Sequence, residues 1–232
     1  MLLSLSKAEL RTYLLDQLEN FFPDGLARKC WMGRDIAIAF DLALDRLEYC
    51  FRHIARSEYS DENGQTFFSH LHSDQWATFL CYFMISLWKE SQNKTVCDKV
   101  LLLNRCLHSI FVSYKCEFPD IVFFAHPIGT ILGNAGYSDY LVVFQNVTVN
   151  TAVPLNGQAR PALGKGLFLA SGAQIIGDKT VGDRVSIGVN AVVYNQEIQD
   201  DQVVTQSRQG GIEIRGRKKA CAAQDYFRSS IL

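Results

Sequence analysis

Apolar residues recur at every sixth position along the C-terminal half of the chain. Most residues that directly follow these positions are Gly or Ala, and a second apolar series lies four positions after each, broken only at Lys179. An α-helix repeats every 3.6 residues and a strand every two, so neither produces this spacing. A coil of short parallel strands does, because one side chain in six points inward and a small residue permits each corner. The inward series is Leu163, Leu169, Ile175, Val181, Ile187 and Val193.

The same six-residue spacing occurs earlier, where Val143 and Val149 are expected to point inward. From Val149 to Leu163 the chain advances fourteen residues, two more than two full repeats. The intervening residues 150–161 are polar and rich in turn formers. We therefore expect an extruded loop between two coils of the same stack.

The first 115 residues have helical spacing instead. Trp76–Trp88 is the longest apolar stretch, with about 13 residues, whereas a membrane span needs about 20, so we expect a buried helix and no membrane span. The sequence thus predicts an α+β chain with a helical domain at 1–115, a coil at 116–200 and a tail at 201–232 that covers the open end of the coil. The expected helices follow the capping box Ser6–Glu9, begin at Asp35, follow Ser73 or Asp74, and follow Thr95.

Charge and cysteine content narrow the class of protein. A formal net charge of −1 and a pI near 6.5 argue against a nucleic-acid partner. Seven scattered cysteines without a C-x-x-C pair favour a reduced, cytoplasmic protein, and no signal peptide is recognisable. His70 and His72 are the one tight histidine pair, and a polar turn before a helix explains them better than a metal site.

His126 is the strongest candidate for chemistry, because it opens the pattern H-x-x-G-x-x-x-G just before the coils. The segment His126–Gly133 resembles the one that carries the catalytic histidine of serine acetyltransferases, and Val143–Val149 resembles their next coil. The chain is therefore similar to the hexapeptide-repeat acyltransferases, which form a left-handed parallel β-helix. This resemblance implies acetyl-CoA as co-substrate, His126 as general base, and direct transfer in a ternary complex. No cysteine lies in residues 121–200 to carry an acyl intermediate.

Three departures from the serine-specific enzymes shape the functional hypothesis. Ala125 stands where they have an acidic residue, Arg160 corresponds to their second histidine, and the helical half differs from theirs. Segments at 71–76, 114–120 and 137–140 resemble relatives associated with surface-polysaccharide O-acetylation. The main hypothesis is therefore transfer of acetyl to a hydroxyl of a sugar or polysaccharide intermediate. The alternatives are a serine O-acetyltransferase of cysteine biosynthesis and a non-catalytic β-helix scaffold subunit.

The resemblance and the local sequence assign further roles. Glu117 or Asp120 is expected to orient His126, with Asp139 as a third possibility in an exposed turn. Arg160 and Tyr137 are expected to contact the acceptor, and no metal is expected. A homo-oligomer, either a trimer or a dimer of trimers, would hold acetyl-CoA between neighbouring coils. The expected cofactor-binding residues are Ala170, Ser171, Gly172, Gly188 and Asn190, through their main-chain N–H groups, and Lys218 and Lys219, through the CoA phosphates.

Overall fold

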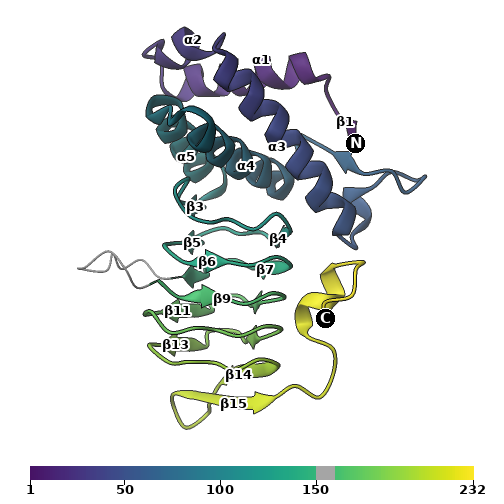
Figure 1. Ribbon diagram of the computed structural model, residues 1–232, viewed down its shortest axis with the longest axis vertical. Helices are drawn as coiled ribbons and strands as arrows, with labels where there is room; N and C mark the ends of the chain where they lie inside the picture. Colours follow the sequence, from purple (N-terminus) through teal and green to yellow (C-terminus); the bar gives the residue numbers. More distant parts are fainter. Residues whose placement is uncertain (150–159) are drawn as a thin grey trace. The chain divides into compact units, whose positions relative to one another are not determined.

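The computed structural model describes residues 1–149 and 160–232, which form two compact units. One unit consists of Met1–Arg52 and Arg56–Ser109, and the other of His53–Ala55 and Ile110–Leu232. The first is built mainly from helices and the second from short stacked strands (Figure 1). The expected extruded loop falls, up to residue 159, outside the described residues.

The helical unit also contains two short strands, β1 (Leu2–Leu3) and β2 (Phe67–Phe68), which pair in parallel, and the 3-10 helix η1 (Ser57–Tyr59). Its α4 (Ser73–Ser91) buries every residue from Asp74 to Leu87, so the expected buried helix at 76–88 is confirmed. No described helix combines the length and the apolar character needed to cross a bilayer. The helices are α1 (Lys7–Phe21), α2 (Leu26–Cys30), α3 (Arg34–His53), α4 (Ser73–Ser91) and α5 (Lys94–His108).

Helix starts agree with the sequence to within two residues. The hydroxyl of Ser6 accepts the N–H of Glu9, and the Glu9 carboxylate accepts the N–H of Ser6, so the capping box is confirmed. At α4 the cap is His72, whose Nδ1 accepts the N–H of Gln75; the expected caps Ser73 and Asp74 are the first residues of the helix itself. Likewise Asn93 caps α5. The short α2 was not expected from the sequence, since it lacks a side-chain cap.

Parallel strands of the second unit form three faces that the chain visits in turn (Figure 1). The expected combination of a helical N-terminal part with many parallel strands is thus confirmed. The first face contains β4 (Val122–Phe124), β7 (Leu141–Val143), β10 (Phe168–Leu169), β12 (Ser186–Ile187) and β14 (Gln202–Gln206). The second contains β3 (Phe111–Val112), β5 (Ile131–Leu132), β8 (Thr148–Val149), β11 (Gln174–Ile176) and β13 (Val192–Tyr194). The third contains β6 (Gly136–Tyr137) and β9 (Ala162–Leu163), continued by single bridges at Val181 and Ile198.

Strand register stacks the predicted inward residues, together with further residues of the first and last turns, into three interior columns. Every member is at most 7% exposed, so the predicted inward positions are confirmed. The columns are Phe124, Val143, Leu169, Ile187 and Val204 on the first face; Leu132, Val149, Ile175 and Val193 on the second; and Tyr137, Leu163, Val181 and Ile198 on the third.

The C-terminal residues first reverse and then return along the coil. Strand β15 (Ile212–Gly216) pairs antiparallel with β14 at the end of the first face. The 3-10 helix η2 (Ala222–Tyr226) then brings the ring of Tyr226 to 5.0 Å from Phe123 and 5.9 Å from Phe168, two aromatic residues of the first face. The yellow segment in Figure 1 follows this path back beside the strands.

The last residues are fastened by Gln224. Its side-chain amide donates to the carbonyls of Phe227 and Ser229, and its oxygen accepts the N–H of Ile231 at 2.9 Å. Ile231 is buried against Gly166, where an added Cβ would lie 2.6 Å from the isoleucine Cγ2. The tail is therefore an ordered part of the coil unit.

Candidate functional site

His126 lies at a corner that is longer than the corresponding corner of the next coil. From Phe124 on the first face to Ile131 on the second, the chain advances seven residues. Their partners in the next coil, Val143 and Thr148, are only five residues apart. The corner between Phe124 and Ile131 thus contains a two-residue insertion, and the His126 side chain is exposed on it.

Backbone conformation locates the inserted residues. Gly129 (φ 73°) lies against the side-chain oxygen of Asn146, as Gly172 lies against that of Asn190 two coils later. Gly129 therefore occupies the regular corner position, and the extra residues precede it. His126 itself has φ 49°, a left-handed conformation that costs about 1 kcal/mol outside glycine. The fold thus maintains a strained backbone at the candidate base.

The residues expected to bind acetyl-CoA at the coil lie at the same corner of later turns, between the first and second faces. They are Ala170, Ser171, Gly172, Gly188 and Asn190. Four of their main-chain N–H groups already donate to the adjacent coil: Ala170 to Ile187, Gly172 to Gln145, Gly188 to Val204 and Asn190 to Ser171. Coil stacking uses these four N–H groups, so the expected contact of each with the cofactor does not fit the structure. Contacts to a cofactor from this corner would then come from other groups, such as the Ser171 hydroxyl.

Glu117 and Arg160 lie together at another place on the coil. Arg160 Nη2 is 2.6 Å from Glu117 Oε1, and both side chains are substantially exposed. Glu117 bridges to Gly136 at the start of the third face, whereas His126 lies between the first and second faces. The structure therefore places Glu117 beside Arg160 and not beside the histidine of the same chain.

Tyr137 is a core residue of the third face. Its side chain is 7% exposed, its hydroxyl donates to the carbonyl of Gly133 at 2.9 Å, and burial raises its pKa well above the ordinary value. The expected contact with an acceptor does not fit this position, because the ring fills the interior column above Leu163. The sequence carried the signal, since Tyr137 lies one six-residue repeat before Val143.

Asp139 organises the entry into β4. One oxygen of its carboxylate accepts the N–H groups of Asp120 at 2.9 Å and Ile121 at 3.0 Å. Asp120 therefore lies at the start of β4, while His126 follows the end of that strand. Asp139 is half-buried and bound to the main chain, so it is less exposed than the turn expected at 137–140.

Lys218 and Lys219 line a basic pocket of about 470 Å³ beside β15 and η2, together with Arg215. Arg217 also lines the pocket and donates its Nε to Asp201 Oδ1 at 2.6 Å. The hydrogen bond from Arg184, followed by the one from Arg217, lowers the pKa of Asp201 to about 2. The two lysines and two arginines outnumber the one acidic lining residue, Asp225, so the pocket is a suitable setting for a phosphate group.

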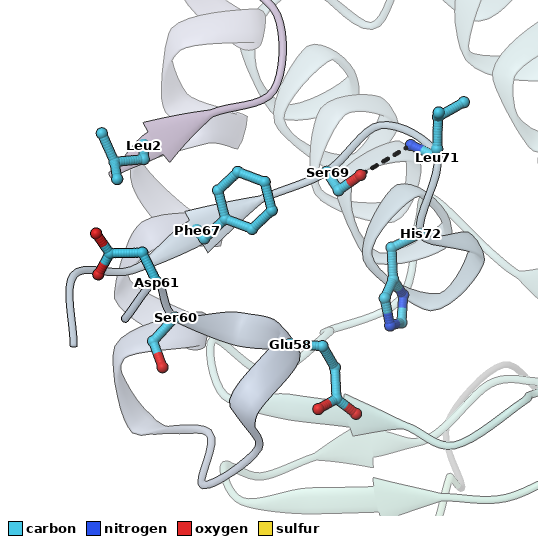
Figure 2. A pocket seen from close by; sticks show the side chains of 8 residues that line it. All are labelled: Leu2, Glu58, Ser60, Asp61, Phe67, Ser69, Leu71 and His72. Carbon is cyan, nitrogen blue, oxygen red and sulfur yellow. Dashed lines mark hydrogen bonds between the residues drawn. The ribbon is translucent and has the colours of Figure 1, made fainter. Parts of the chain in front are cut away.

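A second pocket, of about 640 Å³, lies in the helical unit and contains none of the predicted site residues. Figure 2 shows Leu2 and Phe67 from β1 and β2 on one side, and Glu58 and His72 approaching one another on the other. The helix-capping bond of His72 explains its place there. None of the seven cysteines, all of which lie in the described residues, forms a disulfide.

Comparison with known proteins adds sequence relatives and fold neighbours. No family model matches the chain. A serine acetyltransferase from Synechococcus elongatus is 25% identical over 122 residues, which cover 52% of this chain and 50% of that protein. One from Staphylococcus xylosus is 31% identical over 75 residues, or 32% of this chain and 35% of the relative. One from Helicobacter pylori is 33% identical over 117 residues, or 50% of this chain and 68% of the relative.

The chain belongs to the serine acetyltransferase family. Solved serine acetyltransferases share the fold. The enzyme from Vibrio cholerae superposes with a TM-score of 0.70 over 93% of this chain and 81% of that chain, at 19% identity. A serine acetyltransferase in complex with CoA gives a TM-score of 0.58 over 90% of this chain and 84% of that chain, at 14% identity. The chain spans about half of the Synechococcus relative and about a third of the Staphylococcus one.

Membership of the serine acetyltransferase family corrects the main functional hypothesis. The expected sugar or polysaccharide acceptor is contradicted, because the relatives and the fold neighbours are serine acetyltransferases. The closer resemblance to polysaccharide-associated relatives is likewise unsupported. The departures at Ala125 and Arg160 therefore do not indicate a sugar acceptor.

Proposed function

We propose that this serine acetyltransferase homologue transfers the acetyl group of acetyl-CoA to the hydroxyl of serine, giving O-acetylserine and CoA. The observation that carries the proposal is the His126 corner, which offers an exposed imidazole on a two-residue insertion of the coil. An imidazole titrates near neutral pH and is suited to general base catalysis. The family membership supports acetyl-CoA as the donor and serine as the acceptor.

His126 takes the proton of the serine hydroxyl while the oxygen attacks the thioester carbonyl. A carbon–oxygen bond forms, and the carbonyl oxygen carries the negative charge of the tetrahedral intermediate. When the carbon–sulfur bond breaks, the departing sulfur takes the proton from the imidazolium. Serine and acetyl-CoA are therefore bound together, and no acyl-enzyme forms.

The Glu117–Arg160 ion pair is suited to the two charges of serine. Its members carry opposite charges, and exposed pairs of this kind contribute little stability of their own, so exchange of partners is inexpensive. In the proposed complex Arg160 receives the serine carboxylate and Glu117 the ammonium group. Because this pair and His126 lie at different corners of one coil, we propose that a neighbouring copy supplies the pair.

The same arrangement requires a homo-oligomer, which we propose to be a trimer or a dimer of trimers. Flat coil faces of a left-handed β-helix would pack against one another, with acetyl-CoA between copies. The pantetheine arm would pass the corner of Ser171, and the nucleotide phosphates would enter the basic pocket of Lys218 and Lys219. No metal takes part in the proposed reaction.

The direct test measures CoA release from acetyl-CoA with serine, with homoserine, and with a panel of sugars and nucleotide sugars as acceptors. We expect turnover with serine and product identified as O-acetylserine by mass spectrometry. Turnover with a sugar and none with serine would refute the proposal.

The shared site has a separate test in mixed oligomers. His126→Ala and Arg160→Ala are each expected to lose at least about 99% of the activity alone, because each lacks one half of every site. Unfolding and refolding the two variants together should restore part of the activity, since some interfaces then combine both intact halves. Failure to regain activity, with oligomer formation verified by light scattering, would argue that each site is built from a single copy.

A further inference from the structure

Thr130 is completely buried although it carries a hydroxyl, and it lies just after the insertion that presents His126. Its hydroxyl donates to the carbonyl of Phe144 at 3.0 Å and accepts the N–H of Val147 at 3.3 Å. Both partners belong to the corner of the next coil. A buried hydroxyl that satisfies two main-chain groups at once joins the two corners.

The regular corners show what this hydroxyl replaces. There the fourth corner residue donates its N–H directly to the carbonyl of the first, as Ala173 does to Ala170 at 2.9 Å and Ala191 to Gly188 at 3.1 Å. In the corner formed by residues 144–147, the equivalent groups are those of Val147 and Phe144. The Thr130 hydroxyl stands between these two groups and bonds to both.

The main chain around Thr130 is held at the same point. Its N–H donates to the carbonyl of Pro127 at 3.2 Å, and its carbonyl accepts the N–H of Phe111 at 2.9 Å. The N–H of Ile128 donates to the carbonyl of His126 at 2.7 Å. The insertion is therefore a closed turn whose far end is anchored by Thr130 on both sides.

We infer that Thr130 is a positioning residue for His126: its hydroxyl fixes the inserted corner to the next coil and so sets the place of the imidazole. This inference rests on the proposed function for its kinetic consequences. Misplacing a catalytic group by about 1 Å lowers the rate about a hundredfold. Thr130 itself touches no substrate in this scheme.

Thr130→Val removes the hydroxyl at nearly constant volume, and Thr130→Ser retains it. We expect the valine variant to lower kcat about a hundredfold while the KM for acetyl-CoA changes little, and the serine variant to restore most of the loss. The matched control is Thr78→Val in α4, where a buried hydroxyl donates to the carbonyl of Asp74 at 2.7 Å. The control should lower thermal stability without changing kcat at a temperature where it is folded.

Amide hydrogen exchange provides a measurement that does not depend on turnover. Thr130→Val should raise the exchange rates of the amides of Val147, His126 and residues 128–131, with the rest of the coil unchanged. A valine variant with normal kcat and normal exchange would overturn the inference. If the wild-type protein transfers no acetyl group to serine, the proposed function fails, and the exchange data alone then decide whether Thr130 holds the corner.

Discussion

The helical unit and the coil each have a histidine at or just after the end of a regular element, in opposite settings. His108 ends α5, with Nδ1 2.7 Å from Asn104 Oδ1, and burial lowers its pKa to about 4. His126 follows β4 on an insertion and is exposed. The helical unit keeps the His108 imidazole neutral at pH 7 as a packing group. The coil unit presents the His126 imidazole to solvent. The burial and the hydrogen bonds of a histidine, and not its mere presence, thus distinguish a packing residue from a candidate for chemistry.

The largest expected effect separates the two histidines by activity. His126→Ala should lower kcat about a hundredfold to ten-thousandfold, the range lost with a general base, and leave the unfolding temperature nearly unchanged. His108→Gln should leave kcat within about twofold at neutral pH, since it lies in the helical unit. Steady-state CoA release and thermal unfolding check both. Near-normal turnover in the His126 variant would place the base elsewhere.

The pH dependence of the free energy of unfolding tests the setting of His108. Because the pKa of His108 is lowered in the folded state, the unfolded chain binds more protons between about pH 4 and pH 6.5. The contribution of neutral His108 to the free energy of unfolding is complete above pH 6.5 and is lost as the pH falls towards 4. This loss amounts to up to about 3 kcal/mol. Denaturant unfolding at several pH values should show this slope in the wild type and a smaller slope in His108→Gln. Equal slopes would contradict the burial of a neutral imidazole.

Adjacent positions on β13 test the coil itself. Val193 is 1% exposed in an interior column, whereas its neighbour Val192 is 40% exposed. Val193→Ala should destabilise the coil by about 2 kcal/mol through lost burial and a cavity. Val192→Ala, the matched control, should change the free energy of unfolding by less than about 0.5 kcal/mol. Similar losses in both variants would contradict the inward columns.

The smallest expected effect concerns the basic pocket. Replacing Lys218 and Lys219 together with Ala should weaken CoA binding about fivefold, because exposed charge contacts are worth about 0.5 kcal/mol each and are screened by salt. Dephospho-CoA, which lacks the 3′-phosphate, should bind both proteins more equally. Lys179→Ala, an exposed lysine beside Asp178, is the control. CoA affinity is measured by calorimetry. An unchanged affinity in the double variant would show that this pocket does not bind the CoA phosphates.

Repetition made the interior of the coil predictable. The interior columns can be predicted from the sequence because an apolar residue recurs at every sixth position and points inward, as Leu169 and Ile187 do. Tyr137 obeys this rule too, because it lies six residues before Val143 and fills the interior column instead of contacting an acceptor. Helix starts could be predicted to within two residues. The cap of α4 could not, because His72 and not Ser73 or Asp74 accepts the N–H at the start of the helix, a geometry that composition does not reveal.

Contacts between distant segments were not predictable. The pairing of Glu117 with Arg160 depends on which residues the third face brings together, and the packing of Tyr226 on Phe123 joins positions about a hundred residues apart. The two-residue insertion at His126 appears only when the partners of Phe124 and Ile131 are known. The sequence could nominate the histidine, but the surroundings of its imidazole follow from strand register.

Strand β15 has a consequence for how copies of this chain can associate. A parallel ladder that ends in a bare strand is a template on which further strands, including those of another molecule, can grow. Here the ladder ends in a reversed strand whose sequence places the charged residues Glu213 and Arg215 on alternate positions of the rim. Growth of the first face into an end-to-end filament is thereby discouraged, so association is directed to the sides of the coil.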